Sequence, residues 1–294
     1  MEGTSVVAQP ALNGAVETPS GKGAGDENFP VGSWLIRREL RPHVHAFYRF
    51  ARQADDIADN PALESSDKLR RLDRMGAVLD GADSGKNGGD DSPAARAMRQ
   101  SLVATGTTAQ HCHDVLTAFR MDATKLRYAD WADLMNYCRY SAAPVGRQLL
   151  DLHGESRATW VSSDALCSAL QVLNHLQDCA EDYRLLDRVY LPARELAACG
   201  ADIEALRGKQ SSPGLRCVID RLLDRTDELI ATARALPGGV RSSGLRRECA
   251  VIVNLACRLS RRLRRGDPLA GRVKLSRGDF VLALLTGLVR GGRA

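Results

Sequence analysis

Two pairs of aspartates, each pair four residues apart, are the part of this sequence best suited to chemistry. Asp55 and Asp59 form the first pair, and Asp178 and Asp182 form the second. Carboxylates at this spacing share one face of a helix, where they repel each other by roughly 0.2–0.5 kcal/mol. Mg²⁺ takes one or two such carboxylates and completes its shell with water and phosphate oxygens. Two pairs that converge on one diphosphate would therefore make a magnesium-dependent site.

Each pair continues a polar stripe on an otherwise apolar helical pattern. Tyr48 and Arg52 precede the first pair, and Gln171 and Asn174 precede the second, at steps of three or four residues. Asn and Asp are poor residues for a helix interior, because they compete for backbone hydrogen bonds. One such stripe is more often a solvated face, but two stripes of the same design favour a site. Asp56 lies one residue off the first stripe, as a supporting partner or as an extension of the acidic helix end.

The elements that must position both stripes are helices. Pro42 in a first turn predicts a helix over residues 41–59, which ends before Asn60 and Pro61. The apolar spacing around the second stripe predicts another helix over residues 166–183.

A third predicted helix, over residues 130–152, contains Pro144 and Gly146. A proline inside a helix removes a hydrogen bond and bends the chain. Tyr137 and Ser141 lie one turn apart just before this bend. Two interpretations stay open: a bent core helix, or a bend that opens a cavity for a bulky apolar substrate. In the second, the Tyr137 ring would face developing positive charge.

The composition indicates an all-α protein. Hydrophobic residues make up 44% of the chain and aromatic residues only 5%, while β-branched runs are scarce beside Ala, Leu and Arg. We expect a disordered tail over residues 1–26, followed by one all-α domain over residues 27–294. Loops are predicted at residues 81–93, 200–213 and 236–244.

Charge and cysteine usage limit the partners and the setting. The net charge of +5 is modest, and no stretch combines basic with aromatic residues, so we expect no nucleic-acid partner. The eight cysteines include no Cys-x-x-Cys pair, and no secretory signal opens the sequence. We therefore expect a cytoplasmic protein with reduced cysteines and no disulfide framework.

The C-terminal third suggests a contact with a membrane surface. Residues 280–289 are apolar but too few to cross a bilayer, which takes about 20 residues, so they predict a packed or an interfacial helix. A dense basic run precedes them, and it could be a solvated face, a contact with acidic lipids at the inner face of the membrane, or a diphosphate contact. The run comprises Arg261, Arg262, Arg264 and Arg265.

Three stretches resemble the squalene/phytoene synthase family. FYRFARQADDIADNP resembles its first aspartate-rich motif, QVLNHLQDCAEDYRLLDRVYLP its second, and YCRYSAAPVG the helix that lines its pocket. The resemblance implies the all-α isoprenoid synthase fold, a single-domain helical bundle with a central cavity. It also implies Mg²⁺ held by the four paired aspartates. The substrate-binding residues that it implies are Tyr48, Arg52, Ser141, Gln171, Asn174, Arg188 and Tyr190, with Arg52 and Tyr137 also in catalysis.

Within that family, ENFPVGS at residues 27–33 and the run over residues 122–146 resemble the branch that forms hydroxysqualene. Gln177 stands where many relatives carry a basic residue, which fits a single pre-condensed diphosphate as substrate. The implied activity is that of a carbon–oxygen lyase on presqualene diphosphate. Its implied functional partners are a presqualene diphosphate synthase and a hydroxysqualene reductase. The alternatives are head-to-head condensation of two prenyl diphosphates and a non-catalytic helical scaffold.

Overall fold

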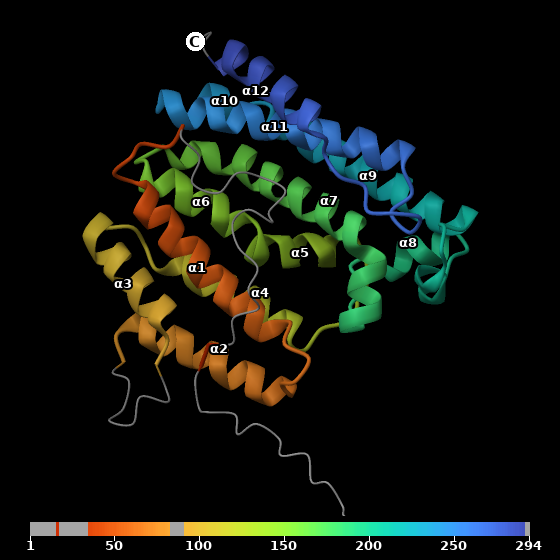
Figure 1. The fold of residues 1–294 in the computed structure, drawn as a ribbon, viewed down its shortest axis with the longest axis horizontal. Coiled ribbons are helices and arrows are strands. Elements are labelled where there is room, and N and C mark those ends of the chain that lie inside the picture. Colours follow the sequence, from red (N-terminus) through yellow and green to blue (C-terminus); the bar gives the residue numbers. More distant parts are fainter. Residues whose placement is uncertain (1–15, 18–34, 83–90, 292–294) are drawn as a thin grey trace, which may run out of the picture.

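The computed structural model describes residues 16–17, 35–82 and 91–291, with side chains up to residue 287, and these residues form a bundle of helices (Figure 1). The described ranges contain no β-strand, and a single bridge pairs Arg127 with Val189. The expected all-α fold is confirmed. Most of the predicted N-terminal tail lies outside the described residues. Within it, Val16 is 2% exposed, and Glu17 accepts a hydrogen bond from the Ser92 hydroxyl.

The helices fall into two packed groups. The first comprises α1 (Arg41–Ala58), α2 (Ser65–Asp80), α3 (Pro93–Thr105) and α4 (Gln110–Asp122). The second surrounds the long helix α7 and comprises α5 (Trp131–Ser141), α6 (Ala143–Leu152), α7 (Trp160–Leu186), α8 (Ala193–Ala198), α9 (Pro213–Ala233), α10 (Leu236–Gly239) and α11 (Ser243–Arg265). Helix α12 (Arg277–Gly291) lies on the outer side of α11 (Figure 1). Helix α4 joins the two groups, because it packs on α1 as well as on α5 and α6.

The helices that carry the two stripes form as predicted. Helix α1 begins with Pro42 in its first turn and ends one residue before Asp59. Helix α7 covers the predicted residues 166–183 and is longer at both ends. Each buries an apolar face in the core, where Phe50, Ile57 and Leu173 are fully buried.

The third predicted helix is two helices. Asp130 caps α5 by accepting a hydrogen bond from the backbone N–H of Asp133. The helix breaks at Ala142, and Pro144 then lies in the first turn of α6. The helix breaks here instead of only bending, because Pro144 has no N–H to continue the hydrogen bonds of α5. The first turn of a helix needs no such N–H, so Pro144 fits the start of α6.

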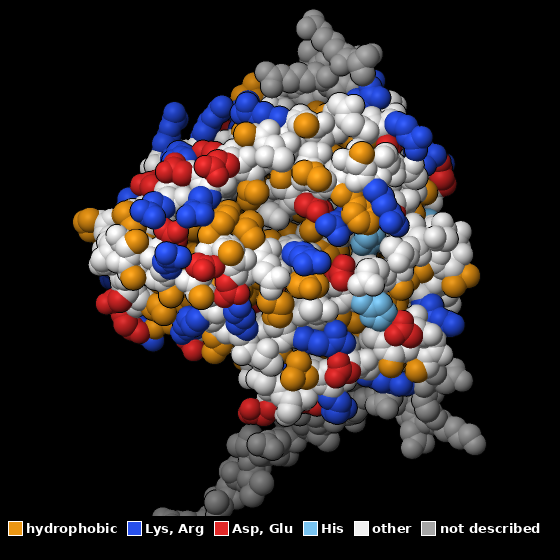
Figure 2. All heavy atoms as spheres, turned by 180° about the vertical axis from the view of Figure 1, so that it is seen from behind, with side chains coloured by type: hydrophobic (Ala, Val, Ile, Leu, Met, Phe, Trp, Pro, Cys, Tyr) orange, Lys and Arg blue, Asp and Glu red, His pale blue; other side chains and the backbone are white. Residues whose placement is uncertain are grey.

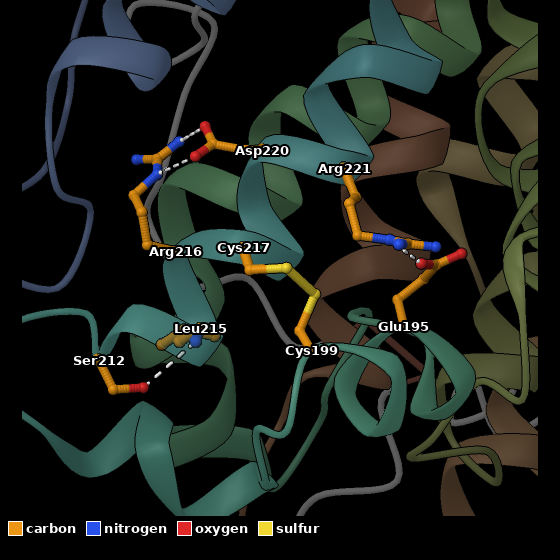
Figure 3. The surroundings of a disulfide bond; sticks show 8 residues. All are labelled: Glu195, Cys199, Ser212, Leu215, Arg216, Cys217, Asp220 and Arg221. Carbon is orange, nitrogen blue, oxygen red and sulfur yellow. Dashed lines mark hydrogen bonds and ion pairs between the residues drawn. A yellow bond between two sulfur atoms is a disulfide. The ribbon is translucent and has the colours of Figure 1, made fainter.

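The prediction that the cysteines form no disulfide is wrong for one pair. Cys199, at the end of α8, is bonded to Cys217 of α9 (Figure 3). The two are 18 residues apart in sequence and belong to no Cys-x-x-Cys pattern. Only the packing of α8 on α9 brings them together, and it is reinforced nearby by the ion pair between Arg221 and Glu195.

Candidate active site

The aspartates of both stripes lie toward the C-terminal ends of α1 and α7, and Arg188 joins them. Its Nη1 donates to Asp59 Oδ1 at 2.8 Å, and its Nη2 donates to the Asp122 carbonyl at 2.9 Å. Arg188 follows α7 directly and is 5% exposed. A residue from the second motif thus holds a carboxylate of the first.

The electrostatics show that the carboxylates of the two helices influence each other. The pKa of Asp182 is raised to about 8, first by burial and then by the charges of Asp178 and Asp59. The pKa of Asp55 is also raised, by partial burial and by the charge of Asp59. Negative charge is therefore in excess at this end of the two helices, which suits a cation.

Arg52 lies beside the first pair and contacts two carboxylates. Its Nη1 is 2.8 Å from Asp55 Oδ2, and its Nη2 pairs with Asp56. Asp56 is 5% exposed, so it acts as a supporting partner that fixes the Arg52 guanidinium. This answers the question that the sequence left open about Asp56.

Sequence reasoning missed Asp122, the buried last residue of α4. Its two carboxylate oxygens accept hydrogen bonds of 2.8 Å from the hydroxyls of Tyr137 and Tyr190. Burial raises its pKa to about 6, against the opposing effect of Arg188. Asp122 therefore connects two predicted site residues to the Arg188 bridge. Asp122 has no second aspartate three or four residues away, so the sequence pattern did not single it out.

The remaining predicted residues of this region lie around an aromatic cluster formed by Tyr137, His175 and Tyr190. His175 stacks on Tyr190 with ring centroids 3.5 Å apart, and Gln171 Nε2 donates to its Nε2. Burial and the charge of Arg188 lower the pKa of His175 to about 3, so the imidazole is neutral. Asn174 is half-buried on the next turn. The buried Ser141 hydroxyl has no hydrogen-bond partner among the residues that the structure describes.

Arg272 is a second residue that sequence reasoning missed. It lies on the segment between α11 and α12, and its Nε and Nη2 reach the two carboxylate oxygens of Asp178 at 2.9 and 3.1 Å. Gln177 is 3% exposed and donates to the Val273 carbonyl, which fastens this segment to α7. The positive charge beside Asp178 thus comes from 94 residues further along the chain.

An apolar cavity of about 360 Å³ precedes the four paired aspartates (the acidic cluster) along α1 and α7. It lies among α1, α6, α7 and the beginning of α11, with Phe47, Leu149 and Leu166 in its wall. Tyr48 also lines it, whereas Tyr137 is part of the aromatic cluster. The lining residues of α1 and α7 precede Asp55 and Asp178 along both helices. The two helices therefore share one apolar end and one acidic end.

The donor set of the acidic end fits a hard divalent cation. All four paired residues offer carboxylate oxygens. Burial and then repulsion from neighbouring carboxylates raise the pKa values of Asp55 and Asp182, and a cation would relieve that repulsion. Within the described ranges, no three His, Cys, Asp or Glu side chains are arranged to hold a metal by themselves. Mg²⁺ commonly completes its shell with water and phosphate oxygens.

Comparison with known proteins gives consistent matches over most of the chain. The family model described as squalene/phytoene synthase matches residues 23–279. The hydroxysqualene synthase of Rhodopseudomonas palustris is 47% identical, over 92% of this chain and 91% of that protein. The hydroxysqualene synthase of Zymomonas mobilis is 43% identical, over 94% and 91%. The crystal structure of squalene synthase HpnC from Alicyclobacillus acidocaldarius is 31% identical with a TM-score of 0.69, covering 80% of this chain and 87% of that one.

Proposed function

We propose that this chain, which belongs to the squalene/phytoene synthase family, converts presqualene diphosphate into hydroxysqualene. One observation carries the proposal: an apolar cavity and an acidic cluster follow each other along α1 and α7. A prenyl diphosphate has the same division into a hydrocarbon part and an anionic part. The similarity to two hydroxysqualene synthases over more than nine-tenths of their length supports this substrate and product.

The acidic end would bind the diphosphate. Mg²⁺ held by the four paired aspartates would supply the positive charge that stabilises the leaving diphosphate. Arg52 would add a charge-assisted contact that strengthens as the leaving group gains charge. Tyr48 and Asn174 would contact the substrate where the cavity meets the acidic end. The hydrogen-bonded residues Arg188, Tyr190, Tyr137 and Asp122 would keep the carboxylates in position.

The apolar end would hold the hydrocarbon while the reaction proceeds. The carbon–oxygen bond to the diphosphate breaks, and its electron pair leaves with the diphosphate. The cyclopropylcarbinyl cation rearranges to an allylic cation, to which a water molecule adds its oxygen before losing a proton. The apolar wall keeps other nucleophiles away from the cation.

Purified protein supplied with presqualene diphosphate or farnesyl diphosphate, with and without Mg²⁺, tests the proposal. We expect hydroxysqualene from presqualene diphosphate only, and only with Mg²⁺. Turnover of farnesyl diphosphate alone would instead support head-to-head condensation. No Mg²⁺-dependent product from either substrate would favour a helical scaffold without catalytic activity.

Single substitutions test the metal assignment. We expect Asp55→Asn and Asp178→Asn to lower kcat by about 100-fold or more, because each removes an anionic metal ligand. Asp187→Asn is a matched control, since this aspartate is 62% exposed and pairs with Arg127. Full activity in either ligand variant would remove the assignment.

The chain is also proposed to work in the cytoplasm, at the inner face of the membrane. None of the helices in the described ranges is long and apolar enough to span a bilayer. Helix α12 nevertheless exposes Val281, Leu282 and Leu285, which would suit contact with a membrane surface. In a flotation assay with anionic liposomes, the intact chain should float with the liposomes, whereas a variant with serine at these three positions should not. Equal flotation of both would contradict the contact.

A further inference from the structure

A basic hollow lies between α11 and the segment that leads from it to α12. It has a volume of about 790 Å³ and shares no residue with the apolar cavity. Three of its lining residues are Gly266, Val273 and Asp279, and the other six carry positive charge. These six are Arg258, Arg261, Arg262, Arg265, Arg272 and Lys274. Like charges gathered at one place repel, so an anion that binds there relieves the repulsion.

Two carboxylates offset part of this charge. Asp279 lies 2.6 Å from Nε of Arg262 and 3.5 Å from Nη1 of Arg258. Asp178 of the acidic cluster lies 2.9 Å from Nε of Arg272. Two negative charges against six positive ones leave the basic hollow with a net positive charge.

The other three cations of the basic hollow are available to a ligand. Arg261, Arg265 and Lys274 are exposed, and their side chains form no ion pair or hydrogen bond with any residue that the structure describes. Arg261 and Arg265 lie one turn apart on α11, so both guanidinium groups can donate to one anion. Guanidinium N–H groups donate in pairs to the oxygens of a phosphate. The hollow therefore fits a phosphate-bearing ligand.

Apolar side chains of α12 continue directly from the basic hollow. Phe280 follows Asp279 in sequence and is exposed. Val281, Leu282 and Leu285 on the same helix are also exposed. Helix α12 lies along α11, so its apolar side chains and the hollow are neighbours (Figure 1). A phospholipid likewise joins an anionic headgroup to apolar chains, whereas a free anion has no part that the apolar residues could contact.

We propose that the basic hollow binds the phosphate-bearing headgroup of anionic phospholipids while α12 beside it contacts the acyl chains. The inference rests on the proposed contact of the chain with a membrane, for which it supplies the headgroup site. It does not depend on the reaction. Binding there would hold the chain at the surface in which an isoprenoid substrate dissolves.

The triple variant Arg261→Gln, Arg265→Gln, Lys274→Gln tests the headgroup site. It removes the three cations that have no partner in the described part of the chain and keeps polar side chains in their place. Flotation with liposomes of phosphatidylglycerol and phosphatidylcholine gives the partition coefficient between liposomes and buffer. This coefficient should fall by about tenfold or more, because each basic residue at an anionic surface contributes to binding. An unchanged coefficient would overturn the inference.

A matched variant separates the hollow from the net charge of the protein. Arg139→Gln, Arg157→Gln, Arg234→Gln removes the same charge at three exposed positions that do not line the hollow. It should partition like the wild-type protein, and thermal melting confirms that both triple variants fold. An equal loss in both variants would show that net charge alone attracts the liposomes, and would reject the site.

Inorganic diphosphate without Mg²⁺ distinguishes the headgroup from a free anion. A free diphosphate is the other phosphate source, since Arg272 connects the hollow with Asp178. Added diphosphate should release the wild-type protein from the liposomes only at the ionic strength at which sodium chloride does so. Release at a far lower concentration would assign the hollow to free diphosphate and overturn the choice of a phospholipid.

Turnover separates this inference from the proposed reaction. With presqualene diphosphate in detergent micelles, the hollow variant should keep the wild-type kcat/KM, whereas with the substrate in anionic liposomes its kcat/KM should be lower. An equal fall in micelles would place the hollow in the catalytic site and reject the lipid. Absence of turnover by every variant, with liposome binding that still depends on the hollow, would reject the reaction alone.

Discussion

At the scale of single residues, Asp122 connects side chains from the predicted pocket helix with side chains from the second aspartate motif. Tyr137 comes from α5, and Arg188 and Tyr190 follow α7, yet all three contact this one aspartate of α4. The motifs could be read from spacing because their residues repeat along a helix. Asp122 could not, because its partners are brought to it only by the packing of α4 on α5 and by the turn after α7.

Replacement of Asp122 should show that it is needed for the fold of this region. Asp122→Asn leaves the buried Arg188 with Asp59 as its remaining carboxylate partner, and Asp59 is 36% exposed. We expect the free energy of unfolding to fall by about 2–4 kcal/mol, measured by urea denaturation at pH 7. The exposed control Asp187→Asn should change it by less than about 0.5 kcal/mol. A loss as small as that of the control would show that Arg188 does not depend on Asp122.

At the scale of elements, the contact between α6 and α7 decides the shape of the cavity. The sequence predicted a weakness near Pro144 but could not tell a bent core helix from one that opens a cavity. The structure places Gln148 and Leu149 of α6 in the cavity wall, which favours the second interpretation. The choice depends on how closely α6 approaches α7, and that distance has no signal in the periodicity of either helix.

Gly146→Ala tests this contact. A Cβ atom at this position would lie 2.7 Å from Cys167 Sγ and closer still to the Ser163 hydroxyl, so α6 would have to move away from α7. We expect a loss of about 1–3 kcal/mol in the free energy of unfolding. Adding Cys167→Ala and Ser163→Ala should restore part of it. No recovery in the triple variant would attribute the loss to the backbone of α6 instead of the contact.

The bond between α8 and α9 makes a further element-scale prediction. Closing a loop of 18 residues in the unfolded chain should stabilise the oxidised protein by about 3 kcal/mol. Reduction with dithiothreitol should therefore lower the urea midpoint of the wild-type protein. The variant Cys199→Ser, Cys217→Ser should start at the lower midpoint and not respond. In a reducing cytoplasm this pair would be thiols, so the comparison also measures the stability without the bond.

At the scale of the whole molecule, the order of helices was predictable and the assembly of the site was only partly so. Helical periodicity located α1 and α7, with Pro42 at the start of α1, and the four aspartates on these helices or directly after α1. A central cavity was expected, but Arg272 and the part of the cavity wall that α11 supplies were not predictable, because they depend on where the segment after α11 and the first turns of that helix pack. A sequence pattern predicts one helix at a time, whereas the site forms where several helices pack together.

The aspartates at the C-terminal ends of α1 and α7 serve activity but lower the stability of the fold. The negative pole of each helix dipole repels a carboxylate there, and the last turn of α1 has no basic residue to offset it. Because the pKa of Asp182 is raised above its ordinary value of 3.8 in the folded protein, its ionisation opposes folding as the pH rises from about 4 to about 8.

The variant Asp182→Asn, which we expect to be inactive, should therefore be more heat-resistant than the wild-type protein. We expect Asp182→Asn to raise Tm by roughly 2–4 °C at pH 8 without Mg²⁺, to lose that advantage below about pH 4, and to gain less from added Mg²⁺ than the wild-type protein. An unchanged or lower Tm at pH 8 would contradict this. If the prediction holds, a screen that selects for thermal stability alone will favour variants that lack these aspartates. Such a screen should be paired with an assay of turnover.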